Sequence, residues 1–264
     1  MKMYVVKATM EGTNMLDKVT LNQLRDMKLT ALATNLVNQQ QSPDILSLSF
    51  EERLGMSVDA EWIARKNRKI NRYIKQANFR FEAVAADIEY TGKHGITKAD
   101  MTRLLEGGYL RNNQNIILSG PTGIGKTYLA CALGREACYQ QIPVIYMRIF
   151  DYFLNLSDAH LENRYTSFRK RLAKTPLLIL DDWGLKPFTT EEMHELMELV
   201  EMRYQNSSTI FCGQLPSSNW HELFEDPTVA DAILDRVIHN SHKFNLTGDS
   251  MRKVLAQKQF DQEE

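Results

Sequence analysis

Hydrophobic residues follow one periodicity in the first third of the chain and another in the remainder. Up to about residue 90 they recur every three or four positions, which is the spacing of amphipathic helices. Thr20 with Gln23, and Ser49 with Glu52, are typical of the capping boxes that open helices. The pattern therefore predicts a small all-helical domain over residues 1–90.

A predicted helix in this first part combines an apolar stripe with a run of positive charge. The stripe recurs at spacings of three, four and seven, and it consists of Ile63, Ile70, Ile74, Ala77, Phe81, Val84 and Ile88. No acidic residue lies between Ala64 and Phe81. The basic residues, which we expect on the opposite side of the helix, are Arg65, Lys66, Arg68, Lys69, Arg72, Lys75 and Arg80.

The single sign of charge on this face sets it apart, because the faces of soluble helices normally mix both signs. We expect the basic side chains to meet the phosphates of duplex DNA, with salt-dependent affinity and little base specificity. A solvated face, an acidic protein partner and a membrane surface are the alternatives that the charge pattern leaves open.

From residue 115 onward, short apolar runs alternate with helix-forming stretches. The runs are Ile116–Leu118, Val144–Tyr146, Leu177–Leu180 and Thr209–Phe211. Short, fully apolar strands between helices indicate a parallel sheet that helices cover on both faces. The pattern predicts an α/β domain over residues 91–264. The glycine-rich segment Thr91–Gly108 is predicted to be a linker with a short helix over Lys98–Leu105.

Composition narrows the class of protein only slightly. Of the 264 residues, 43% are hydrophobic and 25% charged, as in ordinary globular proteins. Cys131, Cys138 and Cys212 have no metal-ligand spacing and are predicted to be reduced, structural thiols. Neither a signal peptide nor a membrane span is recognisable, so we expect a cytoplasmic protein with no membrane partner.

The residues that follow the first predicted strand match the phosphate-loop pattern GxxxxGK[ST]. The loop comprises Gly120, Pro121, Thr122, Gly123, Ile124, Gly125, Lys126 and Thr127, and the helix-forming run starts at Tyr128. Glycines let several backbone N–H groups point at one phosphate, and the following helix favours an anion at its N-terminus. We expect Lys126 to neutralise the β- and γ-phosphates of ATP and the Thr127 hydroxyl to hold Mg²⁺.

Two acidic residues at the end of the third predicted strand complete a hydrolytic site. Asp181 and Asp182 follow the apolar run Leu177–Leu180, and the carboxyl ends of parallel strands face the ligand. We expect Asp181 to reach Mg²⁺ through its water shell and Asp182 to polarise the attacking water. The predicted cofactors are therefore ATP and Mg²⁺.

Several segments, taken together with the phosphate loop, resemble one known family. They are Leu48–Arg53 (LSFEER), Leu177–Leu185 (LLILDDWGL), Cys212–Pro216 (CGQLP), Leu223–Pro227 (LFEDP), Ala232–His239 (AILDRVIH) and Gly248–Lys253 (GDSMRK). This set is similar to that of the IstB-type AAA+ ATPases, the ATP-dependent helpers of insertion-sequence transposases. These proteins are relatives of the DnaC-type helicase loaders. The resemblance covers nearly the whole chain.

The resemblance implies further roles for individual residues. Gln214 is similar to the sensor residue on the strand between the two Walker segments, and Arg236 to the arginine finger that acts on ATP held by a neighbouring subunit. Arg252 resembles a second sensor arginine. Asp182 stands where many AAA+ relatives have glutamate. Since the chain ends at Glu264, a separate C-terminal helical lid is expected to be absent.

The sequence thus predicts a helper ATPase that forms homo-oligomers on duplex DNA, with ATP at subunit interfaces, and presents target DNA to a partner transposase. A helicase loader is the alternative. In a loader the N-terminal helices would grip a protein and the ATPase domain would contact single-stranded DNA. A P-loop kinase is a third hypothesis, which the trans-acting arginine disfavours.

Overall fold

The computed structural model describes residues 17–88, 95–248 and 250–251. The chain divides into two compact units, Met1–Lys69 and Ile70–Glu264, so the division lies inside the long helix α4, Phe50–Ala77. The sequence predicted a boundary at residue 90. The division comes earlier because Tyr73, Ile74 and Ala77 at the end of α4 pack in a core cluster of the second unit.

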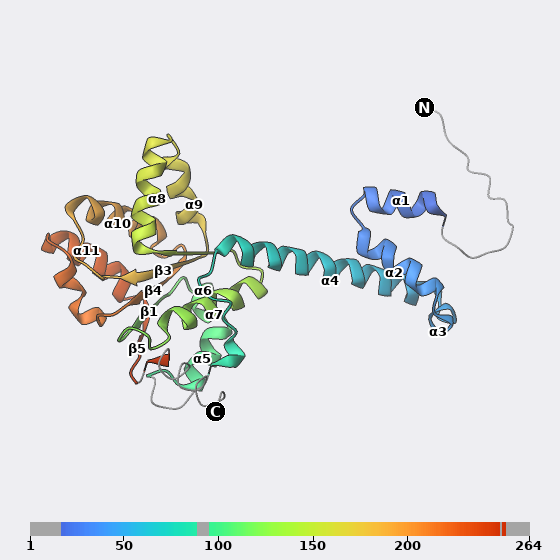
Figure 1. Cartoon of the computed structure of the whole chain (residues 1–264), viewed down its shortest axis with the longest axis horizontal. Coiled ribbons are helices and arrows are strands. Elements are labelled where there is room, and N and C mark those ends of the chain that lie inside the picture. The colour runs from blue at the N-terminus through green and yellow to red at the C-terminus, as the bar shows by residue number, and fades with distance from the viewer. Residues whose placement is uncertain (1–16, 89–94, 249, 252–264) are drawn as a thin grey trace, which may run out of the picture. The chain divides into compact units, whose positions relative to one another are not determined.

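The described part of the first unit is helical, as predicted. Its helices are α1 (Lys18–Asp26), α2 (Thr30–Gln40), α3 (Pro43–Leu46) and the first part of α4 (Figure 1). The Ser49–Glu52 capping box is present, since the Ser49 hydroxyl accepts from the Glu52 N–H and the Glu52 carboxylate from the Ser49 N–H. The expected box at Thr20 was wrong, because α1 begins earlier and is capped by the Asp17 side chain.

The second unit contains five parallel strands in the order β2-β3-β4-β1-β5. Their bounds are β1 Asn115–Ser119, β2 Val144–Arg148, β3 Leu177–Trp183, β4 Ser208–Gly213 and β5 Ser241–Asn245. The four predicted strands are confirmed. The fifth was missed because it is a polar edge strand, and no residue in it is fully buried.

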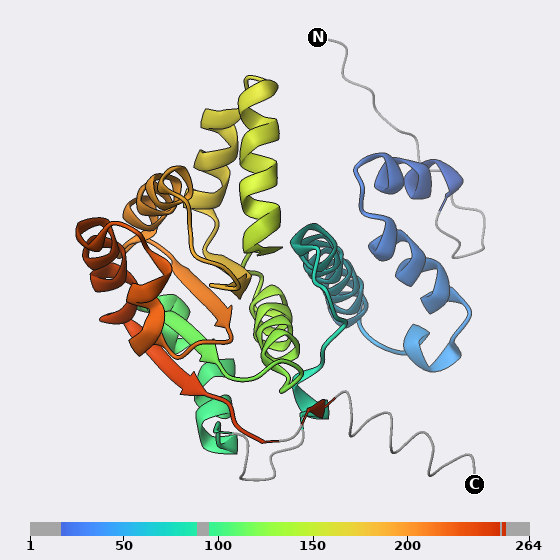
Figure 2. The ribbon, with the colours of Figure 1, turned by 60° about the vertical axis from the view of Figure 1, so that its left-hand side comes forward.

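Alternate residues of the strands point into two separate cores, one on each face of the sheet. Ile116 and Leu118 join the first core, whereas Ile117 joins the second. The first core is covered by α5 (Lys98–Leu105), α6 (Gly108–Arg111) and α7 (Lys126–Tyr139). The second is covered by α8 (Ile149–Leu161), α9 (Tyr165–Lys174), α10 (Thr190–Arg203) and α11 (Pro227–Ile238). Figures 1 and 2 show these two layers of helices with the sheet between them.

The described part of the segment predicted as a linker, residues 95–108, belongs to the folded second unit. Its helix α5 has the predicted bounds, with a capping box between Thr97 and Asp100. Met101, Leu104 and Tyr109 are buried in the first core, so this stretch is part of the domain. Gly107, one of the glycines that suggested a linker, has φ of 73° and introduces α6.

The basic helix is shorter than the apolar stripe predicted. It ends at Ala77, and Asn78 follows with φ of 55°, a left-handed conformation that asparagine tolerates. Phe81 and Val84, expected on the buried stripe, lie beyond the helix and are 39% and 42% exposed. Arg80 likewise lies outside the helix.

Phe79 fixes this turn by packing against Gly134 of α7. A Cβ at Gly134 would lie 2.6 Å from Phe79 Cε1 and 2.9 Å from Ile179 Cδ1. Overpacking in Gly134→Ala should lower the free energy of unfolding by about 1–3 kcal/mol. The better helix propensity of alanine offsets about 1 kcal/mol of that loss. Thermal denaturation measures this. Gly108→Ala is the control: its Cβ would meet only Arg111 at 3.9 Å, so it should be neutral or stabilising.

Two expectations from composition can be compared with the structure. Cys131, Cys138 and Cys212 are free and buried, as expected of structural thiols. Among the helices of the described ranges, none has both the length and the apolarity that crossing a bilayer requires. Residues 252–264, where a lid would follow the sheet, lie outside the described residues.

Candidate nucleotide-binding site

The phosphate loop connects β1 to α7 at the carboxyl edge of the sheet. Gly120, Gly123 and Gly125 have φ angles of 141°, 88° and 102°, which residues with a Cβ rarely adopt. At Gly120 and Gly123 an added Cβ would also lie 2.3 Å from Leu246 O and from Ser250 Oγ. Gly125 caps α7 without a side chain, so the first N–H groups of the helix have no side-chain cap. The loop therefore has the backbone of an anion-binding site.

The Lys126 ammonium lies within the curl of this loop. Its Nζ donates to the carbonyl oxygens of Gly120 (2.7 Å) and Pro121 (2.9 Å). Burial lowers the pKa of Lys126, and the negative charges of Asp181 and Asp182 oppose that shift. These contacts hold the cation at the mouth of the loop, where a phosphate would enter.

Asp181 is buried, and three donors hold its carboxylate. Oδ2 accepts from the Thr127 hydroxyl (2.9 Å) and the Tyr146 hydroxyl (2.8 Å), and Oδ1 accepts from the Asp182 N–H (2.9 Å). Tyr146, on neighbouring β2, was not singled out from sequence. Burial raises the pKa of its phenol, so it stays a donor to Asp181.

Asp182 lies at an irregularity of β3 that turns its carboxylate toward the same side as that of Asp181. Between Leu180 and Trp183 the pairing with β4 shifts by one residue, and Asp182 has φ of 59°. In a regular strand, successive side chains point to opposite faces. Here both carboxylates line one pocket. Among the described residues, no hydrogen-bond donor holds the Asp182 carboxylate, so its oxygens are available to water.

Arg80 places a positive charge close to both aspartates. A guanidinium nitrogen of Arg80 lies 3.8 Å from Asp182 Oδ2 and 4.0 Å from Asp181 Oδ2. The prediction that Arg80 belongs to the DNA-binding face thus placed it wrongly, because α4 ends before it and the following turn directs it toward β3. Burial and the charge of Asp181 raise the pKa of Asp182, while Arg80 is the foremost of the cations that oppose this.

These residues enclose a pocket of about 280 Å³. It is lined by Arg80, Thr122, Gly123, Lys126, Thr127, Asp181, Asp182, Leu185, Cys212, Gly213 and Gln214. Gln214 follows β4, which lies between β1 and β3, so it occupies the position that the sensor resemblance implied. Ile124 is buried in the first core, and the Tyr128 hydroxyl accepts from the Val84 N–H (3.3 Å).

The donor set fits a nucleoside triphosphate with Mg²⁺. The left-handed glycines and the uncapped helix start suit phosphate oxygens. The Thr127 hydroxyl and the Asp181 carboxylate, 2.9 Å apart, are the hard oxygen ligands that Mg²⁺ prefers. No cluster of three or more histidine, cysteine or acidic residues able to hold a metal exists among the described residues, so Mg²⁺ would need phosphate oxygens or water as well.

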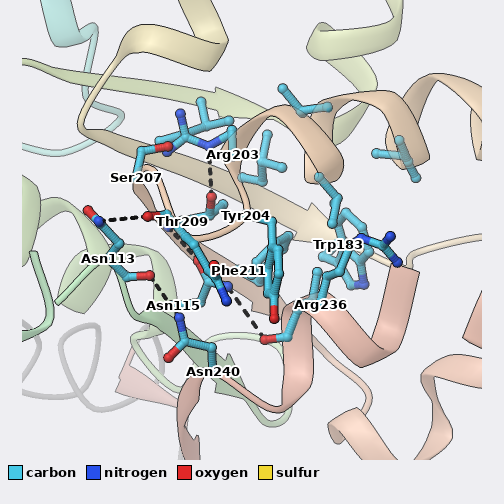
Figure 3. A pocket seen from close by; sticks show the side chains of 17 residues that line it. Asn113, Asn115, Trp183, Arg203, Tyr204, Ser207, Thr209, Phe211, Arg236 and Asn240 are labelled. Carbon is cyan, nitrogen blue, oxygen red and sulfur yellow. Dashed lines mark hydrogen bonds between the residues drawn. The ribbon is translucent and has the colours of Figure 1, made fainter. Parts of the chain in front are cut away.

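Arg236 lies near the amino ends of the strands, whereas the phosphate loop lies at their carboxyl ends. It is near the end of α11, just before β5, and β5 begins where β1 begins. There it lines a narrow pocket with Asn113, Asn115 and Asn240 (Figure 3). A guanidinium nitrogen donates to Ala232 O (2.8 Å), and Nε lies 2.5 Å from the Glu201 carboxylate. The length of β1 alone, on the order of 13 Å, separates this edge from the phosphate loop of the same chain.

The basic residues of α4 fall into two groups. Arg65 and Arg68 pair with Glu61 at 2.8 and 3.0 Å. Glu61 is buried, accepts from the N–H groups of Ala31 and Leu32 at the start of α2, and has a pKa lowered to about 2, chiefly by the Arg65 hydrogen bond. Glu61 thus holds the start of α2 against α4, and the two arginines neutralise its charge. Lys66, Arg72 and Lys75 are exposed and form no ion pair among the described residues. Lys69 is half-buried on the same helix.

Arg252, which the resemblance makes a second sensor arginine, lies outside the described residues. His239 Nε2 lies 3.5 Å from Asp235 Oδ1, and His242 Nε2 lies 3.0 Å from Gln114 Oε1.

Comparison with known proteins places the chain among relatives that share most of its length. The family model described as IstB-like ATP binding protein matches residues 22–259. The chain belongs to this family. A Sinorhizobium fredii protein named as an insertion sequence ATP-binding protein is 40% identical over 239 residues, which is 90% of this chain and 98% of that protein. The insertion sequence IS21 ATP-binding protein of Pseudomonas aeruginosa is 31% identical, over 89% of this chain and 88% of that protein.

Solved structures agree with the fold. The crystal structure of DnaI matches with a TM-score of 0.54 at 18% identity, covering 63% of this chain and 92% of that one. AMPPCP-bound DnaA from Aquifex aeolicus matches with a TM-score of 0.55 at 20% identity, covering 70% and 56%. The predicted fold, an AAA+ P-loop sheet flanked by helices, is confirmed.

Proposed function

We propose that this chain is a Mg²⁺-dependent ATPase that assembles on duplex DNA in the cytoplasm and delivers target DNA to a partner transposase. The observation that carries the hydrolytic part is the bulge in β3. It brings a buried, fully bonded carboxylate, Asp181, and an available one, Asp182, to the same pocket as the phosphate loop. Membership of a family whose relatives are named for insertion sequences supports the link to transposition.

The proposed reaction is hydrolysis of the γ-phosphate. The backbone of the loop and Lys126 would bind the β- and γ-phosphate oxygens. A water oxygen attacks the γ-phosphorus and passes its proton to the Asp182 carboxylate, while the bond to the β–γ bridging oxygen breaks and ADP leaves with its electron pair. Gln214 would orient that water or contact the γ-phosphate. Mg²⁺, held through Thr127 and Asp181, would neutralise charge that develops on the phosphate oxygens.

Assembly would complete the site. Arg236 is too far from the phosphate loop of its own chain to act there, and it is about one-quarter exposed on α11. In a head-to-tail homo-oligomer, ATP would lie at each subunit interface, between Lys126 of one subunit and Arg236 of the next. Nucleotide state would then control assembly on DNA.

The test of this function is ATP turnover per subunit, measured against protein concentration with and without duplex DNA. Turnover that rises with both concentration and duplex supports an assembly on DNA. Turnover that is flat and indifferent to duplex contradicts the assembly mechanism. A response to single-stranded DNA alone would favour the helicase-loader hypothesis instead.

Duplex binding should depend on the exposed cations of α4 that have no ion pair. We expect the triple variant Lys66→Gln, Arg72→Gln, Lys75→Gln to weaken duplex binding at least about tenfold, and to reduce the slope of log affinity against log salt by about 3. Fluorescence anisotropy over a salt series measures both. The triple variant Lys98→Gln, Arg103→Gln, Arg111→Gln removes the same charge from α5 and α6. An equal loss in that control would mean that net charge, rather than the α4 face, determines binding.

A further inference from the structure

Arg80 lies beside the two aspartates of β3 and not on the basic helix α4. It lies three residues after the end of α4, lines the nucleotide pocket, and approaches both aspartates of β3. Its side chain is 40% exposed, so it borders the pocket without being buried in it.

The segment that carries Arg80 is tightly fixed to α7, the helix that begins at the phosphate loop. Phe79 packs on Gly134, and Ala83 is fully buried in the same core. The Val84 N–H donates to the Tyr128 hydroxyl, and the Phe81 ring lies 6.4 Å from the Tyr128 ring. These contacts on both sides of Arg80 fix its backbone beside the pocket.

The distances define what Arg80 can do to Asp182. At 3.8 Å the guanidinium attracts the carboxylate without occupying its oxygens through a short hydrogen bond. It is the one cation within 4 Å of the Asp182 carboxylate among the described residues. A water could still bind the carboxylate.

We propose that Arg80 is a positioning residue of the hydrolytic site: it holds the Asp182 carboxylate toward the pocket and ties the rate of hydrolysis to the placement of the basic helix α4. The second part follows from chain geometry. Tyr73, Ile74 and Ala77 anchor the end of α4 in the first core, and Arg72 and Lys75 lie within eight residues of Arg80. A shift of α4 on binding DNA would move Arg80 through this turn, and Arg80 would in turn move the Asp182 carboxylate. The inference rests on the proposed function.

The test compares Arg80→Gln, Arg80→Lys and wild type in the full-length chain. Because Arg80 acts through Asp182, kcat for ATP should fall at least about tenfold in Arg80→Gln, while KM and the affinity for a fluorescent non-hydrolysable ATP analogue stay within about threefold. Arg80→Lys retains the charge and should recover most of kcat. Arg103→Gln, which removes an exposed arginine of α5, is the control and should match wild type.

Three outcomes would overturn the inference, each for a different reason. A fall in analogue affinity that matches the fall in kcat/KM would overturn the positioning role, since Arg80 would then bind the nucleotide directly. Unchanged kcat in Arg80→Gln, with active wild type, overturns the inference and leaves the proposed function standing. A wild-type chain without turnover overturns both.

The coupling to α4 has its own readout, the ratio of turnover with duplex DNA to turnover without it. This ratio should fall toward one in Arg80→Gln, although duplex affinity stays at the wild-type value. A lower kcat with an unchanged ratio would show that Arg80 serves hydrolysis but does not transmit DNA binding. Parallel thermal denaturation identifies any variant that has lost its fold.

Discussion

Replacing Asp182 by asparagine should reduce ATP turnover by about 10²- to 10⁴-fold, the usual contribution of general acid–base catalysis, and leave nucleotide binding close to wild type. Asparagine keeps the size of the side chain and tolerates the φ of 59° at this position. It loses the negative charge of the carboxylate and, with it, the ability to take a proton. Turnover under saturating ATP, together with the affinity for a fluorescent non-hydrolysable analogue, measures the two effects separately.

Two comparison variants sharpen this result. Lys126→Ala should lose analogue affinity as well as turnover, because its ammonium lies in the phosphate loop. Asp182→Glu restores a carboxylate and should recover turnover to within about tenfold of wild type. If Asp182→Asn hydrolysed ATP at the wild-type rate, the base would have to be another group, and the role proposed for the bulge in β3 would be wrong.

Replacing Arg236 by alanine should remove the rise of turnover with protein concentration. Arginine fingers contribute on the order of 10³–10⁵ in rate, and Arg236 can supply this only to a neighbouring subunit. Dilute protein, which turns over slowly in any case, should be nearly unaffected. Turnover per subunit across a concentration series in the presence of duplex DNA measures the difference.

Glu201 provides a matched control for Arg236. Glu201→Gln removes the carboxylate that pairs with Arg236 but keeps the guanidinium, so cooperative turnover should persist. Mixing Arg236→Ala with Lys126→Ala subunits adds a complementation test, because mixed interfaces can pair an intact Lys126 with an intact Arg236. Recovery of turnover in the mixture supports action in trans. An equal loss for Arg236→Ala at every concentration would contradict it.

Residues with strong local signals were predictable from sequence. The phosphate loop lies between a strand and a helix as expected, and four apolar runs are strands of a parallel sheet. The bounds of α5 were correct because Thr97 and Asp100 form a capping box. Each of these features depends on contacts between near neighbours or on continuous burial, both of which are visible as patterns in the chain.

Features that depend on tertiary contacts were not predictable. The charge pattern placed Arg80 on the basic helix, but a left-handed Asn78 and the packing of Phe79 on Gly134 turn the chain toward the aspartates. Glu61 lies just before the stretch without acids, yet it pairs with Arg65 and Arg68 inside that stretch. The polar segment β5 is a strand because it pairs with the side of β1 that β4 does not occupy.

The left-handed backbone at Asp182 also has an evolutionary consequence. A residue with a Cβ in this conformation costs on the order of 1 kcal/mol relative to glycine, and this cost persists whether or not ATP is ever hydrolysed. A lineage that no longer needed hydrolysis would lose little stability by replacing this aspartate with glycine. Retention of a carboxylate here, in copies of the sequence that drift in every other respect, would therefore be a record of continued selection for turnover rather than for folding.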